Sequence, residues 1–255
     1  MPPSVHPVAG LGFGSAAEAY EHGRPSWAPG AVALLVAELP LGPGRAVADL
    51  AAGTGKLTRL LLPSGAAVVA VEPIPEMAGV LRRAVPGVPV AQGVAEALPL
   101  RDGAVDAVVV AEAFHWFSVG EALAEVRRVL RPGGGLALLW NRAGAEPAPW
   151  QVELGALLAG LRDPTLPFVG SHSRPWAEEV AAAGGFTPLE HRTFPHEQAA
   201  EPEQVVAGAL STSWVAARPD DERRRFADDV RAVLAGHRSP LVVPWRSEVH
   251  WCHRA

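Results

Sequence analysis

Short apolar runs alternate with stretches whose apolar residues recur at helical spacing. The runs cover residues 46–50, 67–71, 88–91, 105–110 and 135–140. They are almost continuously apolar, which is typical of parallel strands that helices cover on both faces. Between them, Met77, Val80, Leu81 and Ala84 illustrate the helical period. This alternation of strands and helices predicts an α/β domain with a mostly parallel sheet.

The pattern changes after Asn141. Helices are expected near 147–162, 175–183, 201–217 and 219–235, with strands over 186–193 and 242–251. We expect segments 143–183 and 195–217 to cap the carboxyl ends of the strands, where open α/β sheets bind ligands. Four units are expected. The first two are an amino-terminal lid over 1–30 and a core over 31–142. A helical cap and substrate region follows over 143–217 and includes the strand near 186–193, and a helix and final strand over 218–255 complete the core.

A glycine-rich turn follows the first apolar run. Residues 47–58 read VADLAAGTGKLT, which indicates a buried strand, a tight turn and a helix start. Glycine lets the backbone lie close against a ligand. Glu72 ends the next apolar run, roughly 20 residues after the turn, where a carboxylate can accept both hydroxyls of a ribose. The alternative is a strand–turn–helix corner without a ligand, but the placement of Glu72 favours an adenosine-type nucleotide.

Three nucleotides compete for this turn. A P-loop for ATP needs glycine five residues before Gly55 and Ser or Thr after Lys56, and the chain has Leu50 and Leu57 there. A dinucleotide motif needs a third glycine where Thr58 stands. S-adenosylmethionine has no phosphate and needs close backbone approach with an acid near its charged methionine end. Asp49 is suited to that position, so S-adenosylmethionine is the preferred interpretation.

Five ordered motifs over about residues 45–141 resemble those of class I S-adenosylmethionine-dependent methyltransferases. They are DLAAGTG at 49–55, VEP at 71–73, GVAEALPL at 93–100, the strand 105–110 with AFHWF at 113–117, and LRPGG at 130–134. The nearest resemblance is to the ubiquinone/menaquinone-biosynthesis and trans-aconitate types. Phe13, Tyr20 and Arg24-Pro25 also resemble the amino-terminal segment of these enzymes. It implies a Rossmann-like, seven-stranded, mostly parallel sheet with helices on both faces, an antiparallel last strand and a helical cap inserted after the fifth strand.

The resemblance also implies the cofactor-binding residues, which are Tyr20, Arg24, Asp49, Ala51, Gly53, Gly55, Glu72, Pro73, Met77, Val94, Ala95, Glu96 and Ala111. Two of these depart from the family pattern. Ala51 stands where glycine is usual, and Val94 stands where an aspartate often accepts from the adenine amino group. The adenine would instead rely on the backbone of Ala95 and on apolar packing from Met77.

Catalysis is expected to be largely positional, because the cofactor carries the chemistry. His115 follows the fourth strand and is the candidate general base, although the alternative that the segment around it packs the pocket wall is favoured over that role. His172, His191 and His196 are interpreted as ordinary histidines. Candidate substrate-binding residues are His115, Trp116, Trp140 and Trp214, with Trp150 and Trp176 as further tryptophans that line a pocket or pack the core.

Composition narrows the function classes. The 255 residues carry a net charge of −5 and no block of Lys or Arg, which argues against a nucleic-acid surface. No apolar run reaches the ~18 residues of a membrane span, and the first residues do not resemble a secretory signal, so a cytoplasmic location is expected. Cys252 is the only cysteine, and no zinc spacing is present, so no metal is expected.

The sequence therefore predicts a methyltransferase acting on a small molecule. Two alternatives stay open. One is a nucleic-acid or protein methyltransferase, although the loop after the fourth strand lacks the motif of amino-methylating nucleic-acid enzymes. The other is a protein that uses the fold and cofactor for another reaction, such as a pericyclase. The acceptor and the oligomeric state are not readable from the sequence.

Overall fold

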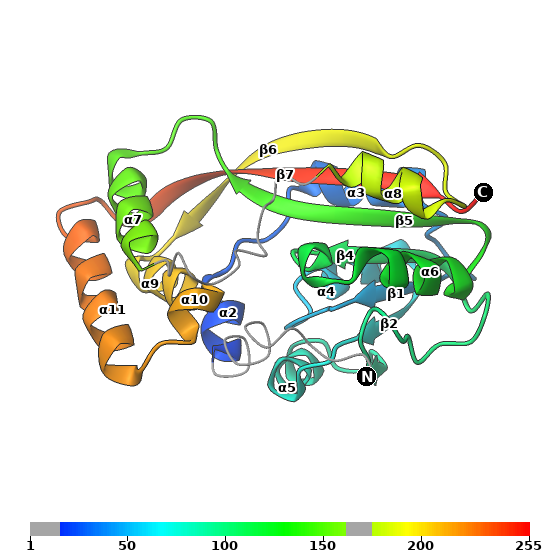
Figure 1. Cartoon of the computed structure of the whole chain (residues 1–255). Helices are drawn as coiled ribbons and strands as arrows, with labels where there is room; N and C mark the ends of the chain where they lie inside the picture. Colours follow the sequence, from blue (N-terminus) through cyan, green and yellow to red (C-terminus); the bar gives the residue numbers. More distant parts are fainter. Residues whose placement is uncertain (1–15, 162–174) are drawn as a thin grey trace.

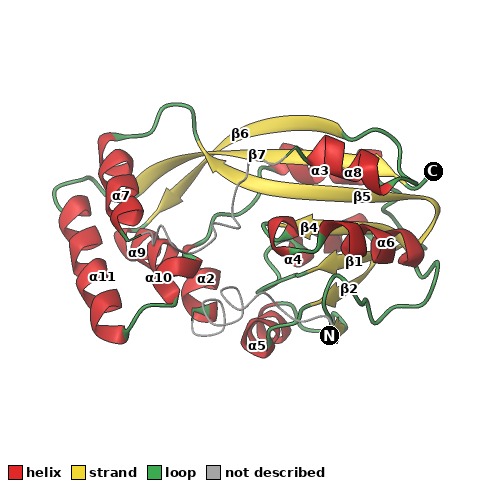
Figure 2. Ribbon diagram, in the orientation of Figure 1, coloured by secondary structure: helices red, strands yellow, loops and turns green. Residues whose placement is uncertain are grey.

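The computed structural model describes residues 16–161 and 175–255. In this part of the chain a seven-stranded sheet has the order β3-β2-β1-β4-β5-β7-β6 (Figures 1 and 2). The strands are β1 (Ala46–Leu50), β2 (Ala67–Val71), β3 (Val90–Ala91), β4 (Val105–Ala111), β5 (Leu130–Ala143), β6 (Glu190–Ala200) and β7 (Leu241–His253). The first five are parallel, and β7 is antiparallel to β5 and β6. The predicted Rossmann-like sheet with an antiparallel last strand is confirmed.

Two apolar clusters explain why the strands are almost continuously hydrophobic. Along β4, Val108 and Val110 face one cluster, whereas Ala107 and Val109 face the other. The first cluster includes α6 (Val119–Val129) and α8 (Trp176–Ala183), and the second includes α3 (Pro29–Glu38) and α4 (Thr58–Leu61). The central strands β1 and β4 are therefore buried on both faces, whereas β6 is largely exposed. Leu81 of α5 (Pro75–Ala84) packs with Ala70 of β2 and with Val85.

The register brings three loops to one edge of the sheet. Asp49 is paired with Ala70 on β2 and with Val109 on β4. The turn after β1, the residues after β2 and those after β4 consequently leave the sheet side by side. This is the edge at which open α/β sheets bind their ligands. The short helix η1 (Leu62–Ser64) lies between α4 and β2, and the single turn η2 (Phe114–Trp116) lies between β4 and α6.

The three strands β5, β7 and β6 extend beyond the ends of the other strands, toward a second, helical lobe (Figure 1). There α7 (Pro149–Gly160), α9 (Pro202–Leu210), α10 (Ser213–Ala216) and α11 (Asp220–Leu234) surround a third apolar cluster. The amino-terminal α2 (Ala17–Gly23) packs against α9 so closely that a Cβ on Gly23 would lie 2.0 Å from the backbone nitrogen of Gly208. The helical cap after the fifth strand is thus present.

Two boundaries of the expected units differ from the structure. The segment 218–255 was expected to complete the core, but Phe226 and Val230 of α11 pack in the cap cluster. The expected cap segment 143–183 contains α8, whose Trp176 and Val180 pack on the sheet beside α6. An amphipathic pattern indicates that a helix has a buried face without indicating which partner covers it. The sixth strand also begins at Glu190, later than the expected 186.

Candidate active site

The turn after β1 has an unusual backbone. Ala51, Gly53 and Gly55 all have positive φ angles, of 53°, 58° and 84°. A Cβ on Gly55 would lie 2.9 Å from Cγ of Leu81, so this glycine is needed for packing against α5. A Cβ on Gly53 would meet nothing within 4 Å, because this residue faces a cavity. Ala51, where the family usually has glycine, takes the left-handed conformation despite its side chain.

Glu72 is buried beside this turn and is held by two backbone groups. Its Oε2 accepts a hydrogen bond of 2.8 Å from the N–H of Gly53, and its Oε1 accepts one of 2.8 Å from Ile74. Burial raises the pKa of this carboxyl to about 7. Each carboxylate oxygen has a second lone pair that can accept another hydrogen bond. The turn and the acid are thus joined as the sequence predicted, although the acid's role toward a ligand stays a prediction.

A first cavity, here called the Glu72 cavity, lies at this edge of the sheet. It is lined by ten of the predicted cofactor-binding residues, which are Tyr20, Ala51, Gly53, Glu72, Pro73, Met77, Val94, Ala95, Glu96 and Ala111, and also by Phe117 and the predicted substrate residue Trp116. The sequence prediction therefore groups residues that the fold does bring together. Gly55 does not line the cavity and shapes the turn instead.

A second cavity, here called the Arg24 cavity, adjoins the first. Tyr20, Ala51, Gly53, Ala111 and Glu112 line both of them. The second cavity adds charged groups, which are Arg24, Lys56 and Arg142. The guanidinium of Arg24 donates to the Ser211 hydroxyl at 2.8 Å and to the Ser211 carbonyl at 3.2 Å, which links the end of α2 to the end of α9.

Glu112 lies where the two cavities meet, and it is not among the residues predicted from the sequence. It follows β4 with a φ of +57°, which is rare for a residue with a side chain. Its Oε1 accepts a 2.6 Å hydrogen bond from the N–H of Asn141, and burial raises the pKa of the carboxyl. Such strained residues are concentrated at functional sites. A glutamate directly after an apolar strand was the available signal.

Asp49 is buried and lines neither the Glu72 cavity nor the Arg24 cavity. The hydroxyl of Thr58 donates to its Oδ2 at 2.6 Å. Oδ1 has no hydrogen-bond partner in the described part of the chain. Burial raises the pKa of the carboxyl to about 7. Asp49 lines neither cavity, so the structure lends no support to its predicted contact with a ligand.

His115 also lies behind the cavity wall. It is 5% exposed, and its Nδ1 lies 3.5 Å from Nε1 of Trp140. Trp140 is fully buried and stacks on Trp176 at 5.2 Å. Trp214 donates to the Leu158 carbonyl at 3.4 Å in the cap. None of His115, Trp140 and Trp214 lines either cavity, and of the predicted substrate residues only Trp116 does. Phe13 and His172 lie outside the described residues.

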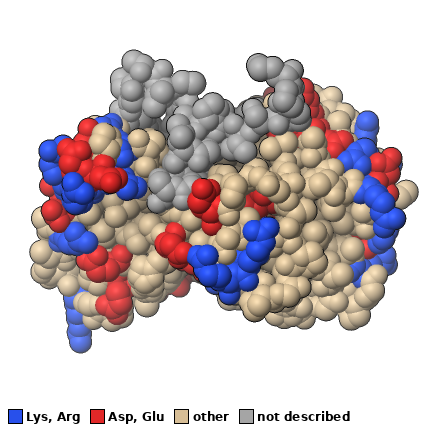
Figure 3. All heavy atoms as spheres, turned by 90° about the horizontal axis from the view of Figure 1, so that it is seen from below, with Lys and Arg blue, Asp and Glu red and all other residues tan. Residues whose placement is uncertain are grey.

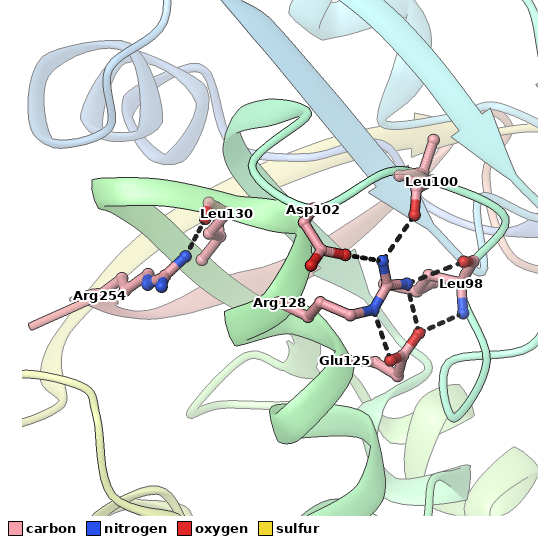
Figure 4. A network of polar contacts seen from close by, with 7 residues as sticks. All are labelled: Leu98, Leu100, Asp102, Glu125, Arg128, Leu130 and Arg254. Atoms are coloured by element: carbon pink, nitrogen blue, oxygen red, sulfur yellow. Dashed lines mark hydrogen bonds and ion pairs between the residues drawn. The ribbon is translucent and has the colours of Figure 1, made fainter.

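A polar clamp fixes the loop that follows residues 94–96 (Figure 4). The guanidinium of Arg128, on α6, bonds both carboxylate oxygens of Glu125 at 2.7 Å and Asp102 at 2.8 Å. It also donates to the carbonyls of Leu98 and Leu100, while Glu125 accepts from the N–H of Leu98. One side chain thereby holds the loop at several points, which fixes one wall of the Glu72 cavity.

Two further observations concern metals and membranes. The described residues contain no group of three or more His, Cys, Asp or Glu side chains that could hold a metal ion. The helices of residues 16–161 and 175–255 include none with the length and apolar character needed to cross a membrane.

Comparison with known proteins places this geometry in a family. Residues 48–138 match the model of a methyltransferase domain. An uncharacterized methyltransferase of Mycobacterium tuberculosis is 41% identical over 227 residues, which are 89% of this chain and 87% of the relative. A demethylmenaquinone methyltransferase of Thermus thermophilus is 36% identical over 151 residues, covering 56% of this chain and 64% of the relative. A putative type II methyltransferase of Anaeromyxobacter dehalogenans has a similar fold, with a TM-score of 0.63 and 24% identity over 89% of this chain and 97% of its own. The chain belongs to the class I methyltransferases.

Proposed function

We propose that this methyltransferase uses S-adenosylmethionine to methylate a small molecule at the junction of the Glu72 and Arg24 cavities. The observation that carries the proposal is the joining of Glu72 to the glycine turn through the N–H of Gly53 at 2.8 Å. A carboxylate held in this way beside a bare glycine surface suits the two hydroxyls of a ribose.

The residues present fit this cofactor. Glu72 would accept from the ribose hydroxyls, and Met77 with the backbone at Val94–Glu96 would border the adenine. Arg24 and Lys56 line the neighbouring cavity, where they would attract the methionine carboxylate, which a guanidinium can bind bidentately. Burial raises the pKa of Tyr20 to about 12, so its hydroxyl stays protonated and able to donate. S-adenosylmethionine supplies, when bound, an electrophilic methyl group on a sulfonium.

The chain itself would position the acceptor and exclude water. Glu112 is the carboxylate shared by both cavities, and it is fixed by Asn141. Burial raises its pKa, which makes the ionised form a stronger base. We therefore assign Glu112 the role of accepting a proton from the acceptor, in preference to His115, which lines neither cavity.

A small-molecule acceptor suits the surface as well as the cavities. On the face in Figure 3, the described Lys and Arg side chains are intermixed with Asp and Glu. Nucleic-acid surfaces gather positive charge on one face instead. The Thermus relative is named for a small-molecule acceptor, demethylmenaquinone, which supports the same class here.

Calorimetric titration with S-adenosylhomocysteine tests the cofactor assignment. Glu72→Ala removes a charged acceptor and should cost about 1.5–3 kcal/mol, a loss of roughly 10- to 150-fold in affinity. Glu76→Ala is the matched control, because Glu76 is exposed on α5. Equal affinity of wild type and Glu72→Ala would contradict the ribose assignment. Release of S-adenosylhomocysteine with a panel of small acceptors then tests the reaction.

A further inference from the structure

A third cavity, here called the cap cavity, lies in the helical lobe. Its volume is about 410 Å³, within the range of ligand pockets. The lining includes Trp150, Leu154 and Leu158 of α7, Val205 of α9, and Val243 and Trp245 of β7. Arg24 is the only charged residue among the described residues that line it.

The amide oxygens of the three glutamines that line the cap cavity are already engaged. The amide oxygen of Gln151 accepts from the N–H of Ala148, and that of Gln204 accepts from the N–H of Glu201, both at 2.8 Å. The amide oxygen of Gln198 accepts from the N–H of Ser26 at 3.1 Å. These oxygens serve the chain's own backbone, so the surface offered to a ligand is predominantly hydrocarbon.

The cap cavity adjoins the Arg24 cavity, where the proposed reaction takes place. Arg24, Pro25, Ala143 and Trp245 line both the cap cavity and the Arg24 cavity. Ala143 and Trp245 are partners in the β5–β7 ladder, so this passage is built on the sheet itself. A ligand whose polar end lies beside Glu112 can therefore extend past these residues into the cap.

One glycine keeps part of this space open. Gly155 lies within α7, where glycine is less favourable than alanine. It lines the cap cavity, and a Cβ at this position would meet nothing within 4 Å. No close helix contact accounts for this glycine among the described residues, whereas a ligand lying along α7 would use the vacant room.

We propose that the cap cavity binds the hydrocarbon part of the methyl acceptor. The acceptor is then an elongated amphiphile, with an aliphatic chain in the cap cavity and a nucleophilic polar end in the Arg24 cavity beside Glu112. This inference rests on the proposed function for the identity of the ligand. The apolar lining indicates the class, because each CH₂ that is removed from water favours binding.

Binding of 11-bromoundecanol without cofactor tests the proposal, since its bromine quenches the fluorescence of a tryptophan that it contacts. Wild type should show saturable quenching, and Trp150→Phe should reduce that signal to the part contributed by Trp245, which also lines the cavity. Gly155→Leu fills the cavity and should weaken binding at least tenfold. Gly160→Leu is the matched control, because Gly160 is on the same helix, has open space at its Cβ and does not line the cavity.

Both glycine variants replace a helical glycine by a good helix former, so both should unfold at or above the wild-type temperature. Their affinity for S-adenosylhomocysteine should equal that of wild type. Absence of saturable quenching in wild type, or equal binding by Gly155→Leu, would overturn the inference. A change of oligomeric state in Gly155→Leu alone would also overturn the inference, because the cap cavity would then be part of an interface between copies of the chain. Failure of S-adenosylhomocysteine to bind wild type would instead refute the proposed function.

Discussion

The carboxylate of Glu112 accepts a 2.6 Å hydrogen bond from the backbone N–H of Asn141, which joins the end of β4 to β5. This bond holds the side chain of a residue whose backbone has a φ of +57°. The carboxylate is thereby fixed at the junction of the Glu72 and Arg24 cavities. Its position, more than its residue type, makes it the candidate base.

Replacing Glu112 by glutamine should lower turnover by about 10²- to 10⁴-fold, because the amide keeps the shape and cannot take a proton. Wild-type turnover should rise with pH through the raised pKa of this carboxyl, since only the ionised form accepts a proton. The measurement is turnover against pH at saturating acceptor. Affinity for S-adenosylhomocysteine should change little.

His115→Phe is the control for that experiment. His115 lines neither cavity and packs near Trp140, so a ring of similar size should preserve most of the turnover and its pH profile. An inactive His115→Phe enzyme that folds normally, beside an active Glu112→Gln enzyme, would reverse the assignment of the base.

The backbone at Glu112 gives a stability prediction that is independent of activity. Glu112→Gly removes the Cβ that the left-handed conformation disfavours, whereas Glu112→Ala keeps it. The glycine variant should therefore be more stable than the alanine variant by roughly 1–2 kcal/mol. Urea denaturation of both variants measures the difference. Equal stabilities would mean that the backbone relaxes when the hydrogen bond to Asn141 is lost.

Stability of the cofactor-free chain should fall as the pH rises from about 4 to 7. Burial raises the pKa of both Asp49 and Glu72 to about 7, from ordinary values of 3.8 and 4.5. The folded chain holds these protons more tightly than the unfolded chain, so their contribution is full below about pH 4 and is lost as pH rises through 7. Asp49→Asn should reduce the fall of the melting temperature between about pH 4 and 7, because only Glu72 then contributes to it, whereas Glu76→Gln should leave the slope unchanged.

The Arg128 clamp should behave in the opposite direction. Hydrogen bonding to Arg128 is the main cause that holds the pKa of Glu125 below its usual value. This contribution is present above the unfolded pKa and is lost as pH falls through the lowered folded value. Arg128→Met should cost about 1 kcal/mol near neutral pH, since the guanidinium is partly exposed, and less in acid. Arg225→Met, which breaks the exposed pair with Asp221, should cost little at any pH.

The predicted lid can be tested by hydrogen exchange. Tyr20 lines both cavities and Arg24 lines the second, while Arg24 is anchored to Ser211. Adding S-adenosylhomocysteine should increase the protection of backbone amides across residues 16–27. In that state α2 would contact the ligand in addition to its existing contact with α9. Exchange in α11, which lies in the cap cluster away from both cavities, provides the internal reference. Identical exchange of 16–27 in both states would contradict the lid.

The sequence predicted the sheet and the cavity wall because these depend on local patterns. The β1 turn needs glycine where φ is positive, and Glu72 must follow the next strand, so both could be read from spacing. The position of Glu112 after an apolar strand was readable from the sequence, but its left-handed backbone and its bond to the N–H of Asn141 were not, because they depend on pairing across the sheet. His115 was placed on the correct loop, but packing of Trp140 on Trp176 determines on which side of the wall its ring lies. The cluster against which α11 packs likewise depends on tertiary contacts, which the local sequence pattern does not indicate.

The pairing of Ala200 with Leu241 has a consequence for how the chain can vary. Residues 201–240, which carry α9, α10 and α11, leave and re-enter the sheet at one pair of neighbouring positions. An exchange of this whole stretch would leave every ladder of the sheet intact, provided that the Gly23–Gly208 contact is kept. The stretch is thus a single insertion between β6 and β7, so a change in its length or sequence can alter the α9 wall of the cap cavity without altering the pairing of β1 with β2 and β4.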